Sequence, residues 1–154
     1  MRFDPHPEPL GAHDEGVLYA ALDLTTALAE VFQASRAIDV RSFAPWVTSW
    51  TPGRELALLD LTDAWALRNG AAQSLSSAPR SVCRSWARAI RASWPGLDGL
   101  LTPSTMTGRP CVVLWNPARN SFPARSAFSR ALASPELLAL VDHLASRIAY
   151  RVVG

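Results

Sequence analysis

The 154-residue sequence contains no lysine, so the fifteen basic side chains other than histidine are all arginine. The absence of lysine excludes Schiff-base chemistry through a side-chain amine. Because arginine presents a planar fork of donors, any cationic contact to phosphate falls to arginine. Thirteen acidic residues leave a formal charge of +2, which is too small to predict nucleic acid or an anionic membrane as the partner.

Cysteine is scarce, and the histidines lack metal-ligand spacing. Cys83 and Cys111 form no CxxC motif, and their apolar or helical surroundings predict small buried side chains in a reducing compartment. A disulfide between them stays open. His6, His13 and His143 are not spaced with cysteines or acidic residues as zinc ligands are, so the sequence predicts no metal site.

Long apolar runs are also missing. No stretch approaches the roughly 18 to 20 apolar residues that a membrane helix needs, and the acidic, proline-containing start does not resemble a secretory signal. We therefore expect a cytoplasmic protein without a membrane segment. There is no internal repeat and no glycine-rich phosphate loop. The length and the 49% of hydrophobic residues predict a single domain over residues 1–154.

Apolar periodicity predicts a mixture of helices and strands. Strands are expected over residues 16–22, 55–61, 98–101, 110–115 and 150–153, and helices over 24–35, 63–67, 79–93 and 135–148. Asp23, Thr62 and Ser134 are the expected helix N-caps. The order lacks a strict βαβ rhythm, which predicts an α+β fold with helices against a twisted, largely antiparallel sheet.

Three helices have apolar stripes that should face the core, and the six tryptophans are expected to be core anchors. The stripes are Ala27, Leu28, Val31 and Phe32 in the first helix, Val82, Trp86, Ala89 and Ile90 in the third, and Leu138, Val141, Leu144, Ala145 and Ile148 in the fourth. Glu30 falls off the first stripe. This placement predicts that its side chain lies away from the buried face of the helix.

The polar candidates have ordinary explanations when each is taken alone. Glu30 is explained as a solvated surface residue, and Tyr19 as a core residue in a strand. Ser104 lies in a Pro-Ser-Thr segment, where a hydroxyl commonly bonds nearby backbone. Arg2 would be part of a frayed terminus. These residues by themselves predict no more than an α+β domain.

Several short motifs follow one another in a particular order between residues 2 and 115. They are RFDP (2–5), GVLYAA (16–21), TALAEVF (26–32), LDLTD (59–63), SWARA (85–89), LDGL (97–100), PS (103–104) and VVLW (112–115). Each motif is weak alone, but the ordered set resembles the RES-domain family. The segment after Trp115 matches no motif, and a cap or an antitoxin-docking helix are the alternatives for it.

The resemblance implies a fold similar to ADP-ribosyltransferase toxins and an enzyme that degrades NAD by hydrolysis or phosphorolysis. NAD is then the substrate, with inorganic phosphate as co-substrate in phosphorolysis, and no further cofactor is expected. The implied partner is an antitoxin with an Xre-like helix-turn-helix domain. The arginine, glutamate and serine that give the family its name match Arg2, Glu30 and Ser104, and an accompanying tyrosine matches Tyr19.

Cleavage of the nicotinamide–ribose bond leaves positive charge on the sugar, as glycoside cleavage does. Under the resemblance, Glu30 holds the nicotinamide ribose and stabilises this charge most in the transition state. Arg2 grips the dinucleotide phosphates or the incoming phosphate. Tyr19 stacks on the nicotinamide ring, and Ser104 donates a hydrogen bond nearby. Glu30, Arg2 and Ser104 are thus the expected catalytic residues, while Tyr19, Arg2 and Ser104 contact the substrate.

RES domains also carry a strand with an aromatic–arginine pair upstream of the motif matched by Arg2-Phe3. The resemblance therefore implies either a truncated start or a shortened form of the domain. A catalytically impaired RES domain that binds a nucleotide or an antitoxin is the alternative function, and binding without turnover would identify it. Direct nucleic-acid binding is the least favoured reading, because no basic cluster supports it. The sequence leaves a homo-oligomer open.

Overall fold

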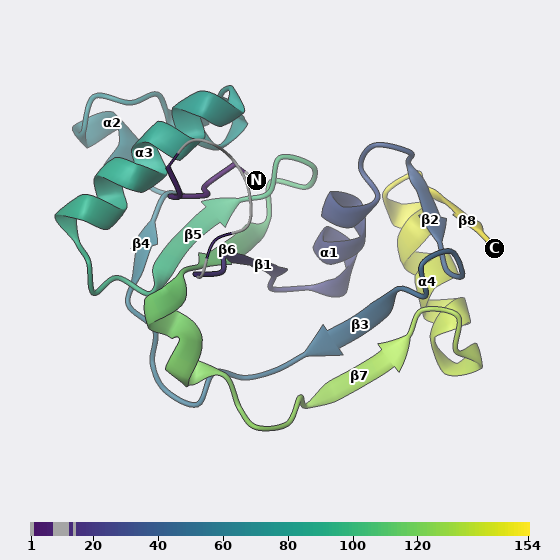
Figure 1. Cartoon of the computed structure of the whole chain (residues 1–154). Coiled ribbons are helices and arrows are strands. Elements are labelled where there is room, and N and C mark those ends of the chain that lie inside the picture. The colour runs from purple at the N-terminus through teal and green to yellow at the C-terminus, as the bar shows by residue number, and fades with distance from the viewer. Residues whose placement is uncertain (1, 8–12, 14) are drawn as a thin grey trace.

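The computed structural model describes residues 2–7, 13 and 15–154, and it mixes helices with strands as the sequence predicts (Figure 1). In chain order the elements are β1 (Leu18–Ala21), α1 (Leu24–Val31), β2 (Ala37–Asp39), β3 (Trp46–Ser49), β4 (Leu58–Asp60), α2 (Trp65–Arg68), η1 (Gln73–Ser77), α3 (Arg80–Ser93), β5 (Gly99–Pro103), β6 (Pro110–Leu114), η2 (Asn116–Ser121), β7 (Phe128–Ala131), α4 (Pro135–Arg147) and β8 (Arg151–Val153). Here η marks a 3₁₀ helix. The α+β class is confirmed.

The strands are distributed over three sheets. The largest has the order β1-β6-β5-β4, in which β6 is antiparallel to both neighbours and β4 is parallel to β5. Strands β2 and β8 form a parallel pair, and β3 and β7 an antiparallel ribbon. The sequence did not predict β2 or β7, which have three and four residues.

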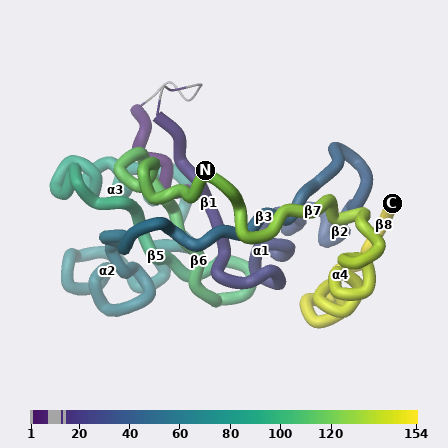
Figure 2. The backbone as a smooth tube through the Cα atoms, turned by 90° about the horizontal axis from the view of Figure 1, so that it is seen from below, coloured from purple at the N-terminus to yellow at the C-terminus, as the bar shows by residue number. Residues whose placement is uncertain are grey.

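Two clusters of buried side chains hold the elements together. In the first, α2, η1 and α3 cover one face of the four-stranded sheet, and Phe3 from the N-terminal arm inserts beside Leu100 and Trp115. In the second, α1 and α4 pack with the β2–β8 pair around Ile38 and Val141. Figure 2 shows α3 and the four-stranded sheet at one end of the molecule and α4, β2 and β8 at the other, with β3, β7 and α1 between them.

The N-cap of α1 is confirmed, and its predicted stripe is correct in part, since Leu28 is buried and Phe32 packs against the second cluster while Val31 is exposed. Asp23 accepts a hydrogen bond from the backbone N–H of Thr26 at 2.9 Å. The helix ends at Val31, whose side chain is 73% exposed, while Thr26 is fully buried. A buried threonine is tolerated here because its hydroxyl has hydrogen-bond partners in Asp23 and Thr107.

In the first turns of α3 the buried side chains lie one residue further along the chain than the predicted stripe. Cys83, Ala87 and Ile90 are buried, whereas Val82 is 41% exposed. Small side chains at 83 and 87 let α3 lie close to the sheet. The buried face is therefore set by which residues fit against the sheet as well as by hydrophobicity.

Two further expectations are corrected. Trp46 and Trp94 are 62% and 46% exposed, so they are not core anchors, although Trp115 is 2% exposed as expected. Thr62 does not cap α2. Its hydroxyl donates to Asp60 at 2.6 Å, and α2 starts three residues later. The Asp60 carboxylate, two residues before the threonine, accepts from both its hydroxyl and its N–H and so holds Thr62 ahead of the helix.

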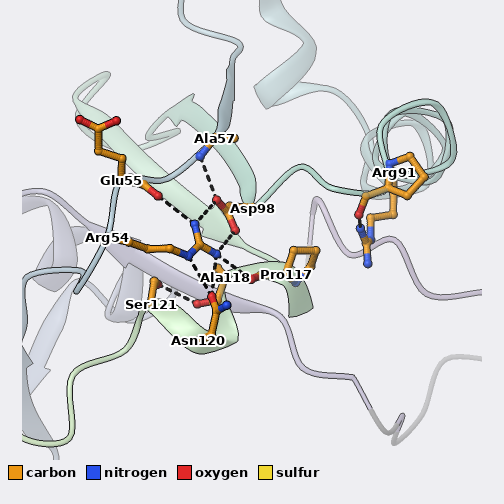
Figure 3. A network of polar contacts seen from close by, with 10 residues as sticks. Arg54, Glu55, Ala57, Arg91, Asp98, Pro117, Ala118, Asn120 and Ser121 are labelled. Atoms are coloured by element: carbon orange, nitrogen blue, oxygen red, sulfur yellow. Dashed lines mark hydrogen bonds and ion pairs between the residues drawn. The ribbon is translucent and has the colours of Figure 1, made fainter.

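A hydrogen-bond network centred on Arg54 and Asp98, the Arg54 staple, joins the loop before β4 to the start of β5 and to η2 (Figure 3). Two guanidinium nitrogens of Arg54 donate to the two carboxylate oxygens of Asp98 at 2.7 and 2.8 Å. The same guanidinium donates to the Asn120 side chain and to the carbonyls of Glu55 and Pro117. Asp98 also accepts from the backbone N–H of Ala57 at 2.9 Å. The staple closes one end of the sheet around a carboxylate that is almost fully buried.

This staple should make stability depend on pH in the acid range. Hydrogen bonds from Arg54 hold the pKa of Asp98 below its usual value, against the opposing effect of burial. A lowered folded-state pKa stabilises the fold above the unfolded-state value, about 3.9, and this contribution is lost as pH falls through the lowered pKa. Urea unfolding should show a constant difference between wild type and Asp98→Asn above about pH 5 that shrinks towards pH 2. A difference that grew on acidification would contradict the assignment.

Candidate functional site

The carboxylate of Glu30 lies against the loop that joins β5 to β6. Its Oε1 atom accepts a hydrogen bond of 2.6 Å from the Ser104 hydroxyl and one of 3.0 Å from the Thr105 backbone N–H. The Thr105 hydroxyl lies 3.5 Å from the same oxygen. The second oxygen, Oε2, has one contact among the described residues, the Gln33 amide at 3.4 Å. One carboxylate oxygen is therefore fixed by the protein, and the other is left for a ligand.

The loop at residues 104–109 is ordered by its own hydrogen bonds. The Ser104 N–H donates to the Arg109 carbonyl at 2.8 Å, and the Gly108 N–H donates to the Ser104 carbonyl at 3.0 Å. Gly108 adopts a φ of 70°, which favours glycine. The Ser104 hydroxyl accepts from the N–H groups of Met106 and Thr107, both at 3.1 Å. Ser104 thus serves as turn residue and as partner of Glu30, so the two explanations of this residue are compatible.

Arg2 and Tyr19 make their hydrogen bonds around the N-terminal arm, not with Glu30 or Ser104. The guanidinium of Arg2 donates to the carbonyl of Ala78, just before α3. The next residue, Phe3, donates its N–H to the Tyr19 hydroxyl at 2.8 Å and accepts from the Trp115 indole at 3.2 Å. These two bonds of Phe3 attach the N-terminal arm to β1 and to Trp115, the residue after β6.

The strand register shows how Tyr19 and Ser104 are placed relative to each other on the four-stranded sheet. Side chains in register on neighbouring strands share a face, and every second residue along a strand returns to that face. The rows on this face are Tyr19–Val113–Leu100 and Ala21–Cys111–Thr102. Ser104 follows Thr102 by two residues, which places it about 13 Å beyond Leu100 along the direction of β5. Tyr19 and Ser104 therefore project from the same sheet face, which η1 and α3 cover between them.

Burial keeps two nearby side chains in their neutral forms. Burial raises the pKa of the Tyr19 phenol, although the hydrogen bond from Phe3 opposes the shift. Burial, followed by the negative charges of Glu30 and Asp23, raises the pKa of Cys111 to about 11. A neutral thiol is a poor nucleophile. Cys111 is therefore not suited to covalent catalysis beside Glu30.

Both cysteines are free, and Cys83 is fully buried as predicted. Cys111 is only partly buried. The disulfide that the sequence left open does not form in this structure. The two thiols belong to different surroundings, since Cys83 lies in the core under α3 and Cys111 lies on β6 beside the Glu30 site.

Two cavities in the described part of the chain lie away from Glu30. One, of about 600 Å³, is lined by Arg54, Asp98 and neighbouring backbone, and the other, of about 400 Å³, by Val17, Trp115 and Arg119 among others. The guanidinium of Arg54 already donates to protein acceptors in the staple. The convergence of polar groups at Glu30 is a better sign of a functional site than the volume of these cavities.

The sequence-based reasoning missed the residues that support Glu30. Thr105 donates its N–H to the carboxylate, Gln33 contacts the second oxygen, and Thr107 joins the loop to α1. The run of hydroxyl residues from 102 to 107, next to a serine already singled out, was the available signal. The spacing of Thr26 and Glu30, four residues apart on a helix, was a second one.

The comparisons with known proteins identify the family. The family model described as the RES domain matches residues 1–135. The chain belongs to the RES-domain family. RES domains are associated with NAD and with toxin–antitoxin pairs, and they are generally enzymes that act on NAD. No curated protein matches the chain, and no solved structure does.

The matched range includes each residue of the candidate site. Arg2, Tyr19, Glu30 and Ser104 all lie within the RES-domain match. The match also extends past Trp115 into the first residue of α4, although no motif after Trp115 had been recognised.

Among residues 2–7, 13 and 15–154, no helix has the length and apolar character needed to cross a bilayer.

Proposed function

We propose that this RES domain cleaves the nicotinamide–ribose bond of NAD, with either phosphate or water accepting the ADP-ribosyl group. The observation that carries the proposal is the Glu30 carboxylate, held through Oε1 by Ser104 and Thr105 while Oε2 has, among the described residues, only the 3.4 Å contact to Gln33. An anchored carboxylate needs little reorganisation when positive charge develops on the ribose. This is the requirement that an oxocarbenium-like transition state imposes.

In the proposed reaction, Glu30 Oε2 accepts a hydrogen bond from a hydroxyl of the nicotinamide ribose. The C–N bond breaks, its electron pair leaves with nicotinamide, and the ribose carbon becomes positively charged. The carboxylate stabilises this charge more than it stabilises the substrate, which raises the rate. An oxygen of phosphate or water then bonds to the same carbon. Ser104 holds Glu30 in place and lies at the edge of the substrate.

Arg2 and Tyr19 are the proposed contacts to the rest of the dinucleotide. Arg2 has further N–H donors besides the one directed at Ala78, and its planar fork suits phosphate oxygens. The resemblance implies that Tyr19 stacks on the nicotinamide ring. Because its ring packs against the first core cluster, we propose instead that its hydroxyl, which accepts from Phe3, donates the phenolic proton to the substrate. The support for both roles is the match of these residues to the motifs of the RES-domain family, since η1 and α3 cover the sheet face between Tyr19 and Ser104.

Substitution of Arg2 should weaken substrate binding more than it slows chemistry. We expect Arg2→Gln to raise KM for NAD by about 10-fold or more, because a charged hydrogen bond to phosphate is lost, with a smaller change in kcat. Initial rates over a range of NAD concentrations measure both constants. Arg125→Gln, at an exposed position in the loop before β7, is the matched control. An unchanged KM in Arg2→Gln would remove Arg2 from the binding site.

The direct test is NAD consumption by the purified protein with and without inorganic phosphate, followed by chromatography of the products. Phosphate-dependent loss that yields ADP-ribose-1″-phosphate would establish a phosphorylase. Loss that does not depend on phosphate and yields ADP-ribose would establish a glycohydrolase. No loss in either buffer by folded protein would contradict the proposed activity. NAD binding without turnover would then favour the impaired binding module.

We further propose that the protein acts in the cytoplasm, where NAD is present, and that an antitoxin with an Xre-like helix-turn-helix domain neutralises it. The support is the family's association with toxin–antitoxin pairs. Expression of the chain in bacteria should deplete NAD and arrest growth. Co-expression of an antitoxin with an Xre-like helix-turn-helix domain should restore growth, and failure to restore it would contradict this partner.

A further inference from the structure

Three polar side chains at the start and along one face of α1 point towards the same loop. Asp23, Thr26 and Glu30 follow one another at three- and four-residue spacing, which places them on one side of the helix. Glu30 contacts Ser104 and Thr105 at the beginning of the loop. Asp23 and Thr26 contact its end. The helix is thus attached to loop 104–109 at two places, one of which is the candidate catalytic carboxylate.

The second attachment is a chain of hydroxyl groups with a defined direction. The Thr26 hydroxyl donates to Asp23 Oδ2 at 2.9 Å and lies 3.0 Å from the Thr107 hydroxyl. A hydroxyl has one proton, so Thr107 must be the donor to Thr26. Thr107 Oγ1 in turn lies 3.3 Å from the Arg109 N–H, and the Arg109 side chain is 3.5 Å from Asp23 Oδ2. Thr26 is fully buried within this chain.

The two attachments are mechanically connected through the loop. Ser104 Oγ accepts from the Thr107 N–H at 3.1 Å and donates to Glu30 at 2.6 Å. Thr26 and Glu30 are separated by four residues, about 6 Å of helix rise. A shift of Thr107 away from α1 would therefore displace Ser104 and Thr105, which hold Glu30 Oε1.

We propose that Thr26 and Thr107 are positioning residues that hold α1 and loop 104–109 in register, so that Glu30 keeps one oxygen anchored and the other directed to substrate. The kinetic part of this inference rests on the proposed function. A helix-capping role for Thr26 is separable from it, because its cap contact uses the backbone N–H, which every replacement except proline retains. The hydroxyl alone makes the contact with the loop.

The test compares Thr26→Val, which removes only the hydroxyl contacts, with Thr26→Ser, which keeps them. Thr48→Val is the matched control, since Thr48 and Ser129 form a similar hydroxyl pair at 3.1 Å on the remote β3–β7 ribbon. We expect Thr26→Val to lower kcat for NAD by about 10- to 100-fold with little change in KM, because a small displacement of the carboxylate is costly. Thr26→Ser should recover most of the rate, and Thr48→Val should match wild type.

Amide hydrogen exchange supplies a readout that does not need activity. The Thr105 N–H donates to Glu30 and the Thr107 N–H donates to Ser104, so both should exchange about 10-fold faster in Thr26→Val if the register loosens. If Thr26→Val does not fold, Thr107→Val removes the same contact from the loop side and leaves the Asp23–Thr26 pair intact.

The outcomes separate this inference from the proposed function. Wild-type kcat and unchanged exchange in Thr26→Val, beside an inactive Glu30→Gln, would overturn the positioning role and leave the NAD reaction standing. An inactive wild type would overturn the NAD reaction, and exchange at Thr105 and Thr107 would then decide the structural role by itself. Equal losses of kcat in Thr26→Val and Thr26→Ser would overturn the role of the hydroxyl.

Discussion

Replacement of Glu30 by glutamine is expected to lower kcat for NAD cleavage by about 10²- to 10³-fold. Glutamine has nearly the same shape, and its carbonyl oxygen can still accept from Ser104 and the Thr105 N–H. The amide lacks the negative charge that would stabilise the ribose cation. Because the contact should strengthen in the transition state, kcat and kcat/KM should fall by similar factors.

The measurement is the initial rate of NAD loss at saturating substrate, with the fold checked by circular dichroism. Glu55→Gln is the matched control, because it removes the same charge from an exposed side chain that points away from the Arg54 staple (Figure 3). It should keep wild-type turnover. Near wild-type turnover in Glu30→Gln would show that the role assigned to this carboxylate is wrong.

The Asp98→Asn replacement is expected to lower the free energy of unfolding by about 2 kcal/mol. The Asp98 side chain is only 4% exposed and makes a two-pronged contact with Arg54. An asparagine places an amide N–H₂ against one set of guanidinium donors, which leaves donors facing donors. This value is below the roughly 3 to 5 kcal/mol for breaking a fully buried ion pair, because Arg54 is 38% exposed and water can replace part of what it loses.

For a chain of this length such a loss corresponds to a fall of about 4–8 °C in Tm. Thermal unfolding of wild type and Asp98→Asn measures it, with Asp142→Asn on the exposed side of α4 as the control. The staple is remote from the Glu30 contacts, so turnover per folded molecule should be unchanged well below Tm. A Tm equal to that of wild type would mean that the staple does not stabilise the fold.

Local features of this chain were predictable because they depend on neighbouring residues. Asp23 caps α1 through a residue three positions away, and Pro135 starts α4 as expected from its fixed φ. The stripe of α4 was largely correct, since Val141, Leu144 and Ala145 are buried. The stripes of α1 and α3 were less accurate, because Thr26 and Cys83 are buried by partners from distant segments.

The candidate site was only partly predictable. Glu30, Ser104, Arg2 and Tyr19 came from the resemblance to RES domains, because their individual patterns indicated surface, turn, terminus and core. The roles given to them stay predictions until turnover is measured. The supporting contacts of Thr105 and Thr107 join segments more than seventy residues apart, a distance over which periodicity carries no information.

The sequence by itself determined the α+β class, the cap of α1 and membership of the RES-domain family, because each depends on local preference or on an ordered set of motifs. The tertiary structure decided that Glu30 meets Ser104 and that Tyr19 shares its sheet face with Ser104. It also decided that Arg54 pairs with Asp98. The physical reason is that strand register and helix docking bring these groups together, and both are settled by packing over the whole chain.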